Sequence, residues 1–382
     1  MRVPDRHVVC LSLTRDGRLA EPEALDHLAA RVPTATDCFV FCPGWRHDRH
    51  VVVDTAARFF SRLDRALTPV GERVTPLRVA VHWPSTPFAD DGQGGTPDLV
   101  LGLGDIARSE PGRVDQVLQA MAEVEVPQGP EEELELEGLR RGLQHRETRG
   151  ALSPAHALAF WVMKRRAGQV GERLGREHLG PLFAGRPLPR LHLIGHSFGA
   201  KLVTSAVLGG LAPRSLTLLL AAFSAFAFAP EVPEVERPGV YHPLLAERRV
   251  EGPIVVLHSA QDRALGSLYP AVTGWGQIER GRRAGRAGEI VARSALGAVG
   301  ARGVGAPTLE LREALRIGLP TRPIVNVDGS RVVRASEWLI GAHRDIDHLE
   351  IATLIGMAAG LLRVGSPPMP RSLPNHLKGG AH

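Results

Sequence analysis

Short apolar runs alternate with longer segments along most of the chain. The runs are four to seven residues long and nearly continuous in apolar side chains, a pattern typical of strands that are buried on both faces of a sheet. These predicted strands are residues 7–13, 37–42, 77–83, 191–194, 216–222, 254–257 and 323–327.

Amphipathic segments separate many of these runs. Segments 52–67, 160–174 and 351–362 carry apolar residues at intervals of three or four, which predicts helices with one buried face. Strands that alternate with helices predict an α/β fold, with a mostly parallel central sheet and helices on both faces. In such a sheet, a functional site lies beyond the carboxyl ends of the strands.

The pattern predicts one domain over residues 1–363, with two insertions. The first insertion, at about 84–150, contains an acidic run from Glu131 to Glu137 and is interpreted as one or two amphipathic surface helices. The second, at about 263–308, is rich in Gly, Ala and Arg and is predicted to be largely loop. Residues 364–382 are rich in proline and are expected to be a disordered tail.

The segment 190–203 carries the most specific motif of the chain. A short apolar strand runs into Gly195-His-Ser-Phe-Gly199, and a helix of small residues follows at once. A G-x-S-x-G motif between a strand and a helix is the signature of a nucleophile elbow, in which the serine occupies a sharp, strained turn. Ser197 is therefore a candidate nucleophile, and the chain resembles the α/β-hydrolases.

Four further segments carry the resemblance in the expected order, over about residues 37–363. They are Pro43-Gly44-Trp45, Val81-His-Trp-Pro-Ser85, His258-Ser-Ala-Gln-Asp262 and Gly341-Ala-His343. The family implies acyl transfer through an acyl-serine, most often to water, without a cofactor. It also implies an oxyanion hole, for which the backbone amides of Phe198 and Trp45 are the candidates. Relatives often have His-Gly where this chain has Pro43-Gly44.

In this fold the catalytic acid and then the histidine follow the serine along the chain. Asp262 comes four residues after His258, beyond a strand end, and is the preferred acid; Asp328 is the reserve. The segment 341–348 offers two histidines before the last helix. His343 is preferred as the base because it precedes the predicted helix start, whereas His348 falls in its first turn.

The same segment, His343-x-Asp-x-Asp-His348, is similar to part of a metallo-β-lactamase signature. That family places the cluster early and has more histidine and aspartate ligands downstream, where this chain has only tail histidines. We therefore predict no metal site.

Charge and hydropathy narrow the classes of partner. The formal net charge is +5, and lysine occurs only at positions 164, 201 and 378, so arginine dominates the 46 basic residues. The basic run 280–286 lacks a recognition helix or a stacking platform, which favours a solvated loop over a nucleic-acid surface.

No apolar run is long enough to cross a membrane, and the first residues lack the apolar region of a signal peptide. We therefore expect a cytoplasmic protein.

Apolar and aromatic residues near strand ends suggest the substrate. Trp83, Phe223 and Tyr269 are candidate contacts for an apolar acyl or alkyl group, so the leading hypothesis is a small-molecule ester. An acyltransferase or thioesterase with the same triad is an alternative. A third is a non-catalytic binding or effector protein that uses the acidic run 131–137 and the basic run 280–286 as partner surfaces. The oligomeric state stays open.

Overall fold

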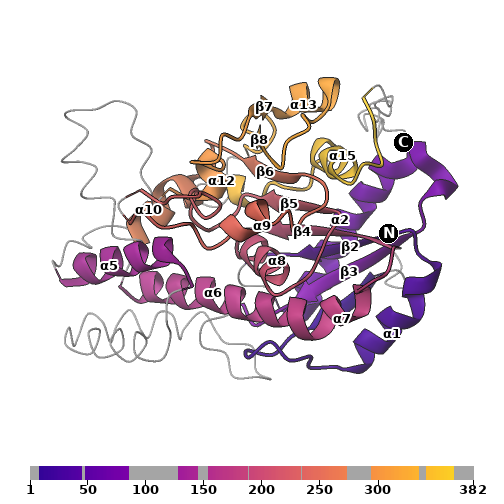
Figure 1. The fold of residues 1–382 in the computed structure, drawn as a ribbon, viewed down its shortest axis with the longest axis horizontal. Coiled ribbons are helices and arrows are strands. Elements are labelled where there is room, and N and C mark those ends of the chain that lie inside the picture. Colours follow the sequence, from indigo (N-terminus) through magenta and orange to yellow (C-terminus); the bar gives the residue numbers. More distant parts are fainter. Residues whose placement is uncertain are drawn as a thin grey trace, which may run out of the picture.

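Eight parallel strands form a single sheet in the computed structural model (Figure 1). Their order is β1-β3-β2-β4-β5-β6-β8-β7. This sheet, with its surrounding helices, confirms the predicted α/β class. The structure describes residues 8–44, 48–85, 128–144, 154–187, 189–233, 235–272, 294–334 and 341–364.

The strands are β1 (Val8–Ser12), β2 (Asp37–Cys42), β3 (Pro76–His82), β4 (Arg190–His196), β5 (Ser215–Leu219), β6 (Ile254–His258), β7 (Thr308–Glu310) and β8 (Ile324–Asp328). The α-helices are α1 (Glu23–Arg31), α2 (Arg49–Leu67), α5 (Pro130–Gln144), α6 (Pro154–Arg173), α7 (Gly180–Phe183), α8 (Phe198–Leu208), α9 (His242–Ala246), α10 (Tyr269–Val272), α12 (Leu296–Val299), α13 (Leu311–Ile317), α14 (Gly341–Arg344) and α15 (Leu349–Ala358). Short 3-10 segments are η2 (Val32–Thr34) and η3 (Thr68–Arg73), and π-helical turns are η4 (Leu174–Leu179) and η5 (Ala264–Leu268).

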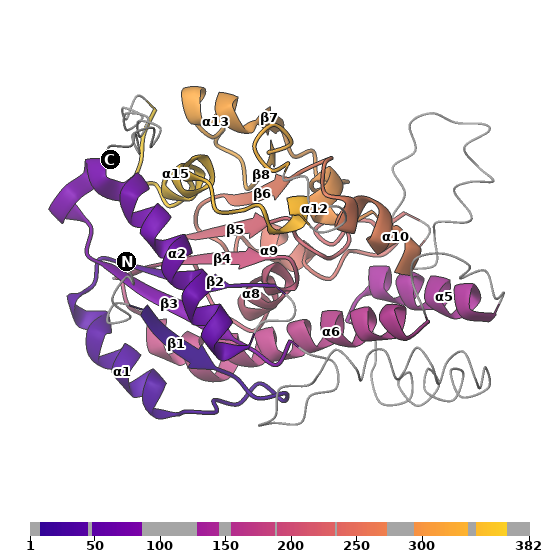
Figure 2. The same ribbon diagram turned by 180° about the vertical axis from the view of Figure 1, so that it is seen from behind.

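The direction in which successive strands are added to the sheet reverses between β2 and β4. From β2 it passes through α2 to β3 on one side, whereas from β4 it passes through α8 to β5 on the other. Right-handed crossovers in opposite directions place α2 and α8 on opposite faces. Accordingly, α8 lies in front of the sheet in Figure 1 and α2 lies in front in Figure 2. The carboxyl ends of β2 and β4 therefore border the switch point at which such sheets bind ligands.

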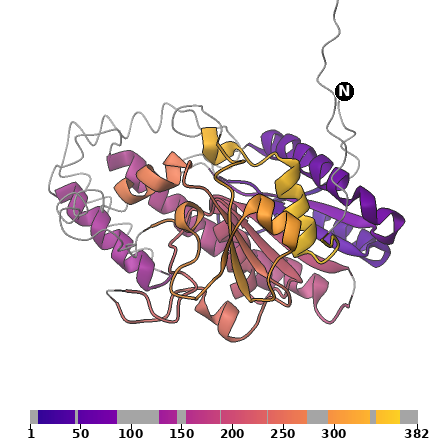
Figure 3. The ribbon, with the colours of Figure 1, turned by 90° about the horizontal axis from the view of Figure 1, so that it is seen from above.

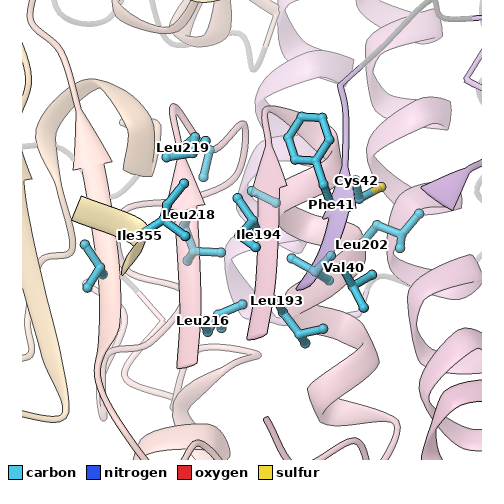
Figure 4. Packing of buried hydrophobic residues seen from close by; sticks show 14 of the residues in the cluster. Val40, Phe41, Cys42, Leu193, Ile194, Leu202, Leu216, Leu218, Leu219 and Ile355 are labelled. Atoms are coloured by element: carbon cyan, nitrogen blue, oxygen red, sulfur yellow. The ribbon is translucent and has the colours of Figure 1, made fainter. Parts of the chain in front are cut away.

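The core lies on both faces of the central strands. Every residue of β2, β5 and β6 is buried, which accounts for the apolar runs in the sequence. Figure 4 shows buried side chains of β2, β4 and β5 packed across neighbouring strands, with Leu202 of α8 on one side and Ile355 of α15 on the other. The labelled strand residues are Val40, Phe41, Cys42, Leu193, Ile194, Leu216, Leu218 and Leu219. This packing fixes the central strands whose carboxyl ends carry the candidate site.

Each predicted strand is present, with ends that differ by at most three residues. The sequence pattern missed β7, because Thr308–Glu310 is short and none of its residues is fully buried. The basic run 280–286 lies outside the described residues, as does the tail beyond Val364.

The acidic run in α5 is not the surface feature that the sequence suggested. Glu133 and Glu137 are exposed, but Glu131, Glu132 and Glu135 are at most 2% exposed. Helix α5 packs on α6 at the end of the molecule far from α1 and α2 (Figures 1 and 3). The interpretation of this run as an amphipathic surface helix therefore does not hold for these three carboxylates, which are buried.

Buried cations explain why these carboxylates can leave water. Lys201 of α8 donates to Glu132 at 2.5 Å, and Lys164 of α6 pairs with Glu135. Burial opposes ionisation of Glu132, but Lys201 and Lys164 outweigh it and lower its pKa to about 2. Burial raises the pKa of Glu131 to about 7. Two of the three lysines in the chain thus hold α5 to the core.

Candidate active site

Ser197 stands at the turn between β4 and α8. Its backbone has φ 57° and ψ −122°, in a region that residues other than glycine rarely occupy. Such a conformation costs on the order of 1–3 kcal/mol and persists only where the surroundings impose it. Strand pairing on one side and the buried helix α8 on the other supply that constraint.

The glycines of the motif are required by close backbone contacts. A Cβ atom on Gly195 would lie 2.4 Å from the Cα of Ala200, and one on Gly199 would lie 2.2 Å from the carbonyl oxygen of Cys42. Both distances are shorter than any real side chain allows. The G-x-S-x-G pattern therefore records how closely strand, turn and helix approach one another.

Three predicted residues meet at this turn. The Nε2 atom of His343 lies 2.8 Å from the hydroxyl oxygen of Ser197, and its Nδ1 atom lies 2.6 Å from Oδ2 of Asp262. A carboxylate can only accept, so Nδ1 carries the proton and donates it to Asp262, which leaves Nε2 to accept from the Ser197 hydroxyl. Asp262 and Ser197 are 1% and 5% exposed.

Asp262 is held by its own loop. Its second carboxylate oxygen, Oδ1, accepts a hydrogen bond from the backbone N–H of Leu265 at 3.1 Å. The backbone carbonyl of Asp262 accepts from Gly266 at 2.8 Å. These bonds aim the remaining oxygen at His343.

The two reserve residues have other partners. Asp328 accepts hydrogen bonds from the backbone and hydroxyl of Ser330. His348 lies 2.6 Å from Asp345. The structure thus places Asp262 and His343, and not Asp328 and His348, at the serine.

Sequence reasoning missed a contribution from His196. Its Nε2–H donates to the backbone carbonyl oxygen of His343 at 2.7 Å, and the two rings lie 5.0 Å apart between centroids. The residue before the serine thereby connects the elbow to the segment that carries the histidine. The motif offered no signal for this contact, because its second position tolerates any residue.

The backbone after β2 lies against the serine. A Cβ atom on Gly44 would be 2.8 Å from the Cβ of Ser197, so only glycine fits there without displacement. The neighbouring Pro43 carbonyl accepts a hydrogen bond from Trp83 Nε1 at 3.3 Å. Trp45, the predicted oxyanion donor of this segment, lies outside the described residues. Phe198, the other predicted donor, is the first residue of α8.

The three predicted substrate contacts are core residues. Trp83, Phe223 and Tyr269 are each at most 1% exposed. Trp83 donates to Pro43, Phe223 packs on Tyr241 with ring centroids 5.2 Å apart, and the Tyr269 hydroxyl donates to Glu135 at 2.5 Å. Their aromatic rings pack in the core. Their predicted role in substrate binding has no support in these contacts.

His258 is the last residue of β6, four residues before Asp262, but it does not join the triad. Burial lowers its pKa, an effect that the charge of Asp328 opposes and that of Arg302 reinforces. Neither of its ring nitrogens has a hydrogen-bond partner among the residues that the structure describes.

Within the described part of the chain, no group of three or more His, Cys, Asp or Glu side chains is arranged to hold a metal ion. None of the described helices is both long and apolar enough to cross a membrane.

Comparison with known proteins gives no match: no family model, no curated protein and no solved structure is similar to the chain.

Proposed function

We propose that the protein is a serine hydrolase of the α/β-hydrolase type that cleaves carboxylic esters. The observation that carries the proposal is the hydrogen-bonded series Ser197–His343–Asp262, which begins at a strained serine beside the switch point of a parallel sheet. A purely structural serine needs neither an oriented imidazole nor a buried carboxylate behind it. Those additional groups are what acyl transfer requires.

In the first half of the reaction, the Ser197 hydroxyl attacks the ester carbonyl while His343 Nε2 takes its proton. Asp262 holds the tautomer in which Nε2 is free to act as a base, and it stabilises the imidazolium that forms. His343 then gives the proton to the leaving alcohol. The product of this half is an acyl-serine.

In the second half, a water molecule takes the place of the alcohol. His343 removes its proton as it attacks the acyl-serine, and the proton returns to Ser197 when the carboxylic acid leaves. The negative oxygen of both tetrahedral intermediates needs two N–H donors. We assign these to Phe198 and to the backbone after β2, for which Trp45 is the candidate.

The proposal includes an apolar acyl or alkyl group on a small-molecule substrate. Its support is the apolar surroundings of the elbow, where Phe198 packs on Phe160 with ring centroids 4.8 Å apart. We also propose a cytoplasmic location, since the three cysteines, Cys10, Cys38 and Cys42, form no disulfide. The mechanism uses no cofactor.

The direct test is hydrolysis of p-nitrophenyl esters with acyl chains of two to twelve carbons. We expect turnover by the wild type and a loss of about 10⁴-fold or more in Ser197→Ala, because the nucleophile is gone. Ser61→Ala, which changes an exposed serine of α2, is the matched control and keeps full activity. A folded wild type that hydrolyses none of the esters, or a Ser197→Ala variant that retains activity, contradicts the proposal.

A further inference from the structure

A cavity of about 640 Å³ opens at the amino-terminal edge of the sheet, opposite the edge that carries Ser197. It lies between Arg214 before β5, Ile254 at the start of β6, Pro323 before β8 and the end of α15. Small-molecule sites have volumes of about 300–1,000 Å³, so this cavity has the size of a binding site. No residue of the triad lines it.

The walls of the cavity are largely apolar. They include Leu244, Leu245, Val250, Ile254, Leu319 and Met357. Next to Leu319 the apolar surface continues outward, because Ile317 and Val364 are 47% and 52% exposed.

Positive charge accompanies these walls. Three arginines line the cavity with one glutamate, and Arg214 pairs with that residue, Glu251. The guanidinium groups of Arg248 and Arg322 have no ion pair or hydrogen bond among the described residues. The cavity therefore combines an apolar wall with two unneutralised cations.

Arg248 occupies a backbone position that favours glycine. It has φ 51° and follows α9, where its N–H donates to Leu245 and the N–H of Arg249 donates to Leu244. This is the Schellman arrangement, in which the left-handed residue after the helix is usually glycine. An arginine at this position strains the backbone, whereas glycine would not. Unlike glycine, however, Arg248 has a side chain that lines the cavity. Such an outlier suggests a functional role for the guanidinium.

We propose that this cavity binds a free fatty-acid anion, with its carboxylate on Arg248 and Arg322 and its chain along Leu245, Leu319 and Met357. Guanidinium groups match the geometry of carboxylates. None of the lining residues is aromatic, so a nucleotide or sugar ring would find no stacking surface. A neutral lipid would leave both cations unused. This site is separate from the proposed catalytic centre and does not depend on its activity.

Calorimetric titration of the full chain with dodecanoate, below the concentration at which it forms micelles, tests the site. We expect Arg248→Gly and Arg322→Gln each to weaken binding by about fivefold, and the double variant by about twentyfold. Arg248→Gly suits the left-handed backbone, so it removes the charge without disturbing the fold. Arg331→Gln removes an exposed arginine after β8, at the opposite edge, and should bind like the wild type.

Acetate has the carboxylate without the long chain, and 1-dodecanol has the chain without the charge. Both should bind more weakly than dodecanoate. Equal affinity of the wild type and both pocket variants would overturn the proposal, since the fatty acid would then bind elsewhere. Absence of dodecanoate binding would also overturn it. So would binding confined to vesicles of anionic phospholipid, because the surface would then recognise a membrane.

Discussion

The two edges of the sheet use side chains in opposite ways. At the carboxyl edge, Ser197, His343 and Asp262 are hydrogen-bonded to one another, and Ser197 and Asp262 are buried. At the amino edge, Arg248 and Arg322 are exposed, and their guanidinium groups have no partner among the described residues. Yet each edge holds a residue other than glycine at positive φ, Ser197 and Arg248.

The two strained residues differ in whether the protein itself supplies partners for their side chains. Ser197 is held by groups of the protein itself, as expected for a site organised before its substrate arrives. Arg248 is strained, and its charge meets no partner in the described part of the chain, as expected where the partner is a separate molecule. Substitutions at the two edges should therefore affect different properties.

Removing the charge of Asp262 should give the largest effect. We expect Asp262→Asn to lower kcat for an ester by about 10⁴-fold, because an amide no longer holds the His343 tautomer that accepts the serine proton. Asp328→Asn is the matched control, since Asp328 is the last residue of the neighbouring strand β8 and hydrogen-bonds Ser330 instead. Steady-state kinetics measures kcat of both variants. An equal loss of kcat in the two would show that Asp262 does not orient His343.

A methyl group on Gly44 should disturb the same edge without removing any catalytic group. Its Cβ would lie 2.8 Å from that of Ser197, so the serine must shift, and we expect kcat to fall by about 100-fold. Gly266→Ala is the control, because a Cβ there meets nothing within 4 Å. If both alanine variants keep wild-type turnover, the backbone after β2 does not position the nucleophile.

Loss of the hydrogen bond from His196 should have a smaller effect. We expect His196→Phe to lower kcat by about tenfold with little change in KM, because one hydrogen bond holds the His343 segment to the elbow. His196→Gln retains an N–H donor at a similar reach and should recover part of the loss. A KM effect alone, or no recovery by glutamine, would show that His196 does not act as a positioning residue.

The smallest effects are on stability, and they compare the edges directly. Glycine relieves backbone strain at both positions. We therefore expect the free energy of unfolding of Ser197→Gly to exceed that of Ser197→Ala by about 1–2 kcal/mol. The same difference between Arg248→Gly and Arg248→Ala should be about 1 kcal/mol. Urea denaturation measures both differences. The Ser197 variants should be inactive, whereas the Arg248 variants should keep full esterase activity. Reduced turnover in Arg248→Gly would mean that the two edges are coupled.

Much of the fold could be predicted from the sequence because its strands are buried on both faces. Burial on both faces requires apolar side chains at successive positions, so every strand except the short, partly exposed β7 is visible as an apolar run. The G-x-S-x-G motif located the turn that places Ser197 beyond β4. The choice of Asp262 relied on chain order and a strand end, which the parallel sheet brings to the edge of Ser197. His343 was preferred because it precedes the predicted helix start; in the structure it lies in the short helix α14, and His348 caps α15 instead of lying in its first turn.

Other features depend on partners that the local sequence does not reveal. The acidic run indicates a surface position for Glu132, whereas in the fold Lys201, which is distant along the chain, neutralises it in the core. Trp83, Phe223 and Tyr269 lie near strand ends, but packing against helices decides that they are buried. The contact of His196 with His343 and the cavity at the amino edge also arise only in three dimensions.

Labelling with a fluorophosphonate probe, followed by peptide mapping, shows whether His343 activates Ser197. Such probes react with a serine only when a neighbouring base activates it. We expect one labelled residue, Ser197, with labelling lost in His343→Ala and retained in His348→Ala. A label on another residue, equal labelling of the two histidine variants, or an unreactive folded wild type would contradict it.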